Sequence, residues 1–169
     1  MTLTYKNILL NLSYYSVAIL VLPWGLLSLE TEWGFPRDPS PSLHYAAIIL
    51  GTVGFALQLW CIILFQRFGE GTPSPLFPPR KLVTMGPYRF VRNPMNVGEL
   101  MVLVSLAGWF GSRALLAYAL IAWLAFHIFI VLLEEPRHLK RFGDEYGQYK
   151  ATVNRWIPKL RGISELRRV

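Results

Sequence analysis

The hydrophobic pattern of the chain is dominated by three long apolar runs, at residues 8–29, 45–65 and 97–133. About 20 apolar residues cross the hydrocarbon core of a membrane, so each of the first two runs predicts one transmembrane helix. The third run is long enough for two helices, and its small, polar and charged residues 111–113 predict a turn between them. We therefore expect an all-α integral membrane protein with about four transmembrane helices, the last two forming a helical hairpin (97–110 and 114–133).

The polar tail after these runs carries a second helical signal. Tyr146, Tyr149, Val153 and Trp156 recur at spacings of three and four, which predicts an amphipathic helix with an aromatic face. Aromatic and basic residues together suit the membrane–water interface, so this helix could lie on the membrane surface. It could instead pack as a lid over the acidic residues that precede it. The spacing alone fits both arrangements.

The composition supports a membrane protein. Apolar residues make up 53% of the chain and charged residues only 16%, whereas soluble domains carry about 25% charge. Aromatic residues reach 14%, which excludes a disordered chain. Cys61 is the single cysteine, which excludes a disulfide scaffold and a cysteine-based structural zinc site, and we expect no metal.

The charge distribution predicts the orientation. The formal net charge is +7, but the basic residues lie between the apolar runs and not along one polar face, which argues against a nucleic-acid partner. Residues 66–94 and 134–169 each carry a net charge of +4, and residues 30–43 a net charge of −2. Cytoplasmic loops are enriched in Lys and Arg. We expect a multi-pass protein of the cytoplasmic membrane with both termini in the cytoplasm.

Candidate polar chemistry begins at the start of the third run. Asn93 and Pro94 suit the first positions of a helix, and starting the helix is one explanation of both residues. A helix N-terminus facing a cavity also attracts a carboxylate, and Arg89 and Arg92 add charged donors unless they only reach lipid phosphates. Glu99 is an ionisable residue at membrane depth, which makes it a functional candidate, although an acid near a helix start is stable there in any case.

A second group of polar residues follows the hairpin. His127 lies within an apolar run, where it could serve as a helix-to-helix hydrogen bond or as a catalyst. Glu134 and Glu135 repel each other and oppose the helix dipole, so we expect a compensating cation: Arg89, Arg92 or a bound ligand. On an unbroken helix His127, Val131, Glu134 and His138 would share one face, a pattern that Pro136 should disturb.

Three motifs now stand in order along the chain: residues 86–95 (GPYRFVRNPM), residues 134–149 from the acidic pair to Tyr149, and residues 155–158 (RWIP). Together they resemble the isoprenylcysteine carboxyl methyltransferase family, especially its small prokaryotic-type members, which are related to phospholipid methyltransferases. The resemblance covers about residues 71–158 and implies a methyltransferase-like core (71–160). We expect this core to belong to one membrane domain (1–169), whose two N-terminal transmembrane helices (1–66) follow from hydropathy alone. The resemblance also implies S-adenosyl-L-methionine as cofactor and a small lipophilic molecule or lipid as methyl acceptor.

The resemblance also carries residue roles onto this chain. Contacts to the cofactor would come from the segment before and within the third run and from the acidic pair: Tyr88, Arg89, Val91, Arg92, Asn93, Pro94, Met95, Gly98, Glu134 and Glu135. If the acceptor needs a general base, His127 and Glu99 are the candidates. Residues 128–133 lack the Arg that prenylcysteine enzymes place before the acidic pair, so a prenylcysteine carboxylate is disfavoured as acceptor.

Two other readings of the sequence stay open. The chain could be a non-catalytic membrane anchor or subunit, in which case the acidic pair and the nearby arginines only face water. It could also be a membrane lipid reductase of similar helical layout. The oligomeric state is left open, because the small residues Ala47 and Gly51 could pack a helix of the same chain or of another.

Overall fold

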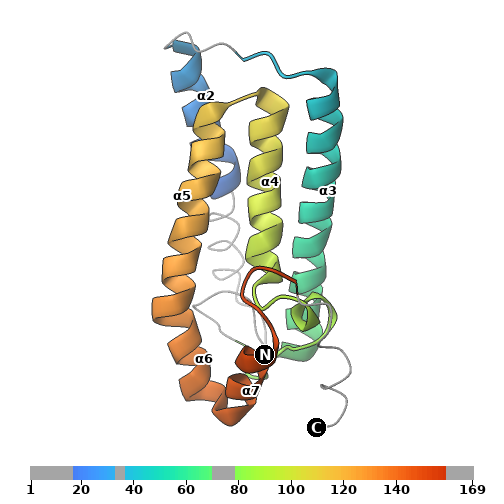
Figure 1. Cartoon of the computed structure of the whole chain (residues 1–169), viewed down its shortest axis with the longest axis vertical. Coiled ribbons are helices and arrows are strands. Elements are labelled where there is room, and N and C mark those ends of the chain that lie inside the picture. The colour runs from blue at the N-terminus through green and yellow to red at the C-terminus, as the bar shows by residue number, and fades with distance from the viewer. Residues whose placement is uncertain (1–16, 33–36, 70–78, 159–169) are drawn as a thin grey trace. The chain divides into compact units, whose positions relative to one another are not determined.

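A computed structural model describes residues 17–32, 37–69 and 79–158 (Figure 1). The described residues form helices and loops without a strand, so the all-α prediction is confirmed. In chain order the helices are η1 (Val17–Val21), α2 (Leu22–Glu32), α3 (Pro41–Leu64), η2 (Phe65–Gly69), η3 (Gly86–Arg89), α4 (Pro94–Phe110), α5 (Arg113–Phe129), η4 (Ile130–Glu134), α6 (Glu135–Phe142) and α7 (Asp144–Thr152). The label η3 denotes a 3₁₀-helix, and the other η elements are π-helical turns.

Two helical stretches are long and apolar enough to cross a membrane: Pro41–Gly69 with 29 residues and Arg113–Phe142 with 30. Only 22% and 17% of the residues in their apolar windows are buried, so most of their apolar side chains face outward, as lipid contact requires. Helix α4 is apolar but shorter. Residues 8–16 of the first expected span lie outside the described residues, and a total of four spans stays a prediction.

The described residues fall into two compact units, and each is built from two separate stretches of sequence. Unit 1 comprises the described residues up to Gly54 together with residues 100–123. Unit 2 comprises residues 55–99 and the described residues from 124 onward. The sequence predicted a division of the chain into residues 1–66 and 71–160, which follows the apolar runs and does not coincide with these two units. The single membrane domain stays a prediction.

Small residues allow close helix packing in unit 1. A Cβ atom added at Gly51 of α3 would lie 2.7 Å from Ser105 Oγ of α4, closer than side chains tolerate. A Cβ atom at Gly108 would meet the Cβ of Ala47 at 3.6 Å. The small pair in α3 therefore contacts a helix of the same chain, which answers the question that the sequence left open for these residues.

The turn between α4 and α5 lies where the sequence predicts it. Gly111 has a φ of +61°, a conformation that favours glycine, and Ser112 caps α5 by accepting a hydrogen bond from Leu115 N at 3.0 Å. Glu30 accepts hydrogen bonds from the Ser112 hydroxyl and, at 2.8 Å, from Ala114 N. Glu30, which the charge count places in the acidic segment 30–43, lies within α2, and its buried side chain is a second cap of α5.

The aromatic face of the tail is internal to unit 2. Tyr146, Tyr149 and Val153 form a buried cluster, with Leu82 and Phe142 packed against it. The aromatic face thus packs within unit 2, and the place of the tail relative to the membrane stays a prediction. The expected helix is shorter than its spacing suggests, because α7 ends at Thr152 and the chain continues without helix.

Candidate functional site

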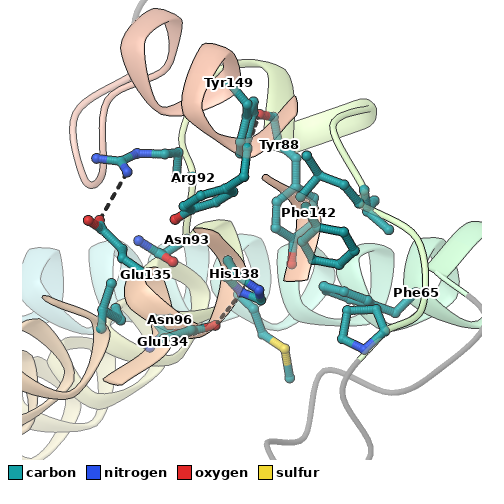
Figure 2. Close-up of a pocket in the computed structure, with 16 residues that line it drawn as sticks. Phe65, Tyr88, Arg92, Asn93, Asn96, Glu134, Glu135, His138, Phe142 and Tyr149 are labelled. Atoms are coloured by element: carbon teal, nitrogen blue, oxygen red, sulfur yellow. Dashed lines mark hydrogen bonds and ion pairs between the residues drawn. The ribbon is translucent and has the colours of Figure 1, made fainter. Parts of the chain in front are cut away.

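A hollow in unit 2 gathers residues from η2, from the segment that leads into α4, and from η4 through α7 (Figure 2). It holds about 650 Å³ of space between atoms, including the part that opens to solvent. Its wall combines aromatic, acidic and basic side chains: Phe65, Pro79, Leu82, Val83, Tyr88, Arg92, Asn93, Met95, Asn96, Ile130, Glu134, Glu135, His138, Phe142, Tyr146 and Tyr149. Apolar walls with a few convergent polar groups are typical of small-molecule sites.

The basic partners of Glu135 come from three segments of unit 2. Arg92 Nη1 lies 3.0 Å from Glu135 Oε1, and Arg155 Nε donates a hydrogen bond to the same oxygen at 2.7 Å. Lys150 Nζ lies 2.8 Å from Oε2. Glu135 is only 5% exposed, so these cations offset the cost of burying its charge. The expected compensation is thus made by Arg92 and two tail residues, and not by Arg89, which is exposed at the end of η3.

Glu134 has a different environment. Its Oε1 lies 3.4 Å from His138 Nε2, one helical turn onward, so the expectation that Pro136 disturbs the shared face at this step is wrong (Figure 2). The π-helical turn η4 ends at Glu134, just before Pro136, whose ring nitrogen cannot donate a backbone hydrogen bond. The Glu134 side chain is 37% exposed. Glu134 therefore lines the hollow, and its carboxylate can accept further hydrogen bonds.

Backbone contacts attach the tail to the segment before α4. Arg92 N donates a hydrogen bond to the Asn154 carbonyl at 2.8 Å, and Asn93 Nδ2 donates to the Arg155 carbonyl at 3.3 Å. Asn93 also stands directly before α4, as its predicted capping position requires. The residues that follow α7 therefore help to hold Arg92 and Asn93 in place.

Burial fixes the protonation of the tail's tyrosines. The Tyr149 hydroxyl donates a hydrogen bond to the Tyr88 carbonyl at 2.7 Å, and burial raises the pKa of Tyr149 well above its usual value. Burial, and then the Glu135 carboxylate, raise the pKa of Tyr146. The hydrogen bond to Glu135 raises the pKa of Arg155. Near neutral pH both tyrosines therefore remain hydrogen-bond donors and Arg155 remains charged.

The two candidate bases lie outside the wall of the hollow. His127 Nδ1 accepts a hydrogen bond from Trp156 Nε1 at 3.1 Å. Because the indole nitrogen can only donate, neutral His127 carries its proton on Nε2. Glu99 is 4% exposed in α4, and its Oε1 has no hydrogen-bond partner among the described residues.

Six of the residues that the resemblance assigns to the cofactor line the hollow: Tyr88, Arg92, Asn93, Met95, Glu134 and Glu135. The other four do not: Arg89 is exposed, and Val91, Pro94 and Gly98 are buried elsewhere. Sequence reasoning assigned no site role to Phe65, His138, Phe142, Tyr146 or Tyr149, which also line it. The helical spacing of the tail tyrosines was the signal available for two of them.

Comparison with known proteins identifies the protein family to which the chain belongs. The family model described as phospholipid methyltransferase matches residues 43–145, more than half of the chain and most of unit 2's site. The chain therefore belongs to this family of membrane methyltransferases, and the predicted resemblance to the isoprenylcysteine carboxyl methyltransferase type is confirmed.

Individual relatives differ in what they methylate. The chain is 30% identical over 168 residues to methanethiol S-methyltransferase 1 of Bradyrhizobium diazoefficiens, covering 89% of this chain and 54% of the relative. It is 27% identical over 150 residues to phosphatidylethanolamine N-methyltransferase of Uncinocarpus reesii, covering 79% of this chain and 14% of the relative. It spans only part of each of these proteins.

One solved structure shares the fold. It is a eukaryotic intramembrane Ras methyltransferase, an isoprenylcysteine carboxyl methyltransferase, with a TM-score of 0.59 and 24% sequence identity. The similarity covers 89% of this chain and 54% of that one. At this identity it supports the helical membrane fold and carries no acceptor over to this chain.

Proposed function

We propose that the chain is an S-adenosyl-L-methionine-dependent methyltransferase that methylates a small lipophilic acceptor in the membrane. Family membership and relatives named as S-, N- and carboxyl methyltransferases support the methyl transfer. Those names place the methyl group on different atoms, so the acceptor of this chain is not carried over from any of them. Methyltransferase relatives favour this reading over a bare anchor or a reductase.

The observation that carries the proposal is that Arg92 and Glu134 line the same hollow. Arg92 Nε is buried without a hydrogen-bond partner among the described residues, whereas Nη1 forms an ion pair with Glu135 at 3.0 Å. Buried donors left unsatisfied are costly, so a bound anionic group would stabilise this position. The partly exposed Glu134 carboxylate can accept hydrogen bonds from a cationic or hydroxyl-bearing group in the same hollow.

The cofactor's groups match these residues. Its carboxylate suits Arg92, its ammonium or ribose hydroxyls suit Glu134, and its adenine suits the aromatic wall of Phe142 and Tyr146. When bound, S-adenosyl-L-methionine supplies an electrophilic methyl group on a sulfonium. The task of the protein side chains is then to orient the cofactor and the acceptor and to exclude water.

For a protic acceptor we favour Glu99 over His127 as the general base. Nδ1 of His127 already accepts the Trp156 hydrogen bond, so proton uptake there would break that contact. Glu99 has an oxygen that no described residue engages. Since α4 also supplies Met95 and Asn96 to the hollow, Glu99 lies about one helical turn from its wall.

The proposal is tested by isothermal titration of the purified chain, in detergent, with S-adenosylhomocysteine. The parent chain should bind, and Glu134→Gln should bind more weakly by about 1.5–3 kcal/mol, the value of a hydrogen bond to a charged group. Glu145→Gln, at an exposed position outside the hollow, is the matched control and should bind like the parent. A parent chain that does not bind S-adenosylhomocysteine would exclude the proposed function.

A further inference from the structure

Two buried polar side chains lie in the apolar helices outside the hollow. Among the residues that the structure describes, Gln58 Nε2 and Glu99 Oε1 are buried without a hydrogen-bond partner. The two residues are 6% and 4% exposed. Such atoms lose their bonds to water and gain none in return, and polar groups at membrane depth commonly mark a ligand path. The cofactor groups assigned to Arg92 and Glu134 leave Gln58 unexplained, and they give Glu99 no binding partner beyond its proposed role as general base.

Both residues belong to unit 2, and helix geometry places them on the same side of the hollow. Helix α3 leads into Phe65 and α4 begins at Pro94, and the hollow is lined by Phe65 and by Met95. Gln58 precedes Phe65 by two turns on one helix face, which is about 10 Å along the axis. Glu99 follows Met95 by one turn on its face, about 6 Å along the axis. Both positions therefore lie beyond the hollow within apolar helix.

We propose that Gln58 and Glu99 form a subsite for the reacting polar end of the methyl acceptor; this inference rests on the proposed function. The Glu99 carboxylate accepts a hydrogen bond from the N–H, O–H or S–H of the acceptor atom, which keeps a lone pair free for the methyl group. The Gln58 amide donates a hydrogen bond to the second lone pair that a hydroxyl or thiol offers. The apolar remainder of the acceptor lies in lipid. The subsite selects a head group that donates a hydrogen bond to Glu99, and a fatty carboxylate is rejected because it would face Glu99.

The location is tested on the parent chain in lipid nanodiscs with a dodecylamine probe that carries a diazirine beside the amine. Photolabelling followed by peptide mass spectrometry should place the label within residues 55–64 and 95–103. The labelling should be suppressed by an excess of at least one of dodecylamine, dodecanethiol and dodecanol, and the strongest competitor identifies the preferred head group. An excess of dodecanoate should not suppress it. Label confined to other helices, or equal suppression by dodecanoate, would overturn the proposal.

Substitutions provide the second readout. Gln58→Met and Glu99→Gln should each reduce labelling about tenfold while the affinity for S-adenosylhomocysteine stays within twofold. Ser105→Ala is the control, because Ser105 is also a buried polar residue of α4 but donates its hydrogen bond to Val102 O at 2.7 Å. Labelling that is unchanged in both subsite variants would overturn the proposal, and if a variant fails to fold, the parent's label map decides.

Each of the two proposals can be refuted independently of the other. A parent chain that is labelled at the subsite but does not bind S-adenosylhomocysteine refutes the methyltransferase function and retains an amphiphile site. A parent chain that binds S-adenosylhomocysteine but is labelled elsewhere retains the function and refutes the subsite.

Discussion

Replacing Glu135 by Gln should destabilise unit 2, whereas the same change at Glu134 should not. Glu135→Gln removes the negative charge that Arg92, Lys150 and Arg155 share and leaves these cations close together. Arg92 is only 9% exposed, and breaking a buried ion pair costs about 3–5 kcal/mol. Lys150 is 46% exposed, so water screens its ion pair with Glu135 and we assign little stabilisation to that pair. We expect a loss of about 3 kcal/mol in the free energy of unfolding.

Thermal unfolding in detergent measures this loss. For a chain of this size about 1 kcal/mol shifts the midpoint by about 2–4 °C, so Glu135→Gln should unfold about 6–12 °C below the parent. Glu134→Gln is the matched control, because its one ion-pair partner among the described residues is His138 and its side chain is partly exposed. A midpoint for Glu135→Gln within 2 °C of the parent would refute the claim that the three cations depend on this carboxylate.

Three further outcomes follow from the structure. Trp156→Phe removes the hydrogen bond to His127 and should cost about 1 kcal/mol, read as a small drop in the thermal midpoint. Gly111→Ala, at a φ of +61° and with Pro39 Cδ 3.1 Å from the added Cβ, should cost at least about 1 kcal/mol in the same assay. Cysteine placed at Ser40 should react with an impermeant thiol reagent from outside and cysteine at Ser164 should not; the reverse pattern would overturn the predicted orientation.

Local signals in the sequence predicted the helical framework well. The turn at Gly111 and Ser112 follows from a permissive glycine and a capping serine, both of which act within a few residues. The burial of Glu30 could not be predicted in this way, because its partners Ser112 and Ala114 lie more than 80 residues onward in the chain. A charge beside an apolar run looks exposed until the distant backbone that it caps is known.

The site shows the same division between local and distant information. The repulsion within the Glu134–Glu135 pair predicted a compensating cation, and Arg92 was among the candidates. Lys150 and Arg155 were missed because α6, Gly143 and α7 reverse the chain before it returns to Glu135. That path depends on Gly143 with a φ of +55°, and no spacing rule in the sequence gives the direction in which the chain then continues.

Methyl transfer from S-adenosyl-L-methionine is measured most directly with the radiolabelled methyl donor. Purified chain in lipid nanodiscs is incubated with the donor and each dodecyl amphiphile in turn, and label is counted in the organic extract. Label should appear in the extract with at least one amine, thiol or alcohol, and it should be lost in a variant with Arg92→Ala and Glu134→Gln. Absence of label with every acceptor, from a chain that binds S-adenosylhomocysteine, would contradict the assigned acceptor class; absence of both binding and label would contradict the methyltransferase itself.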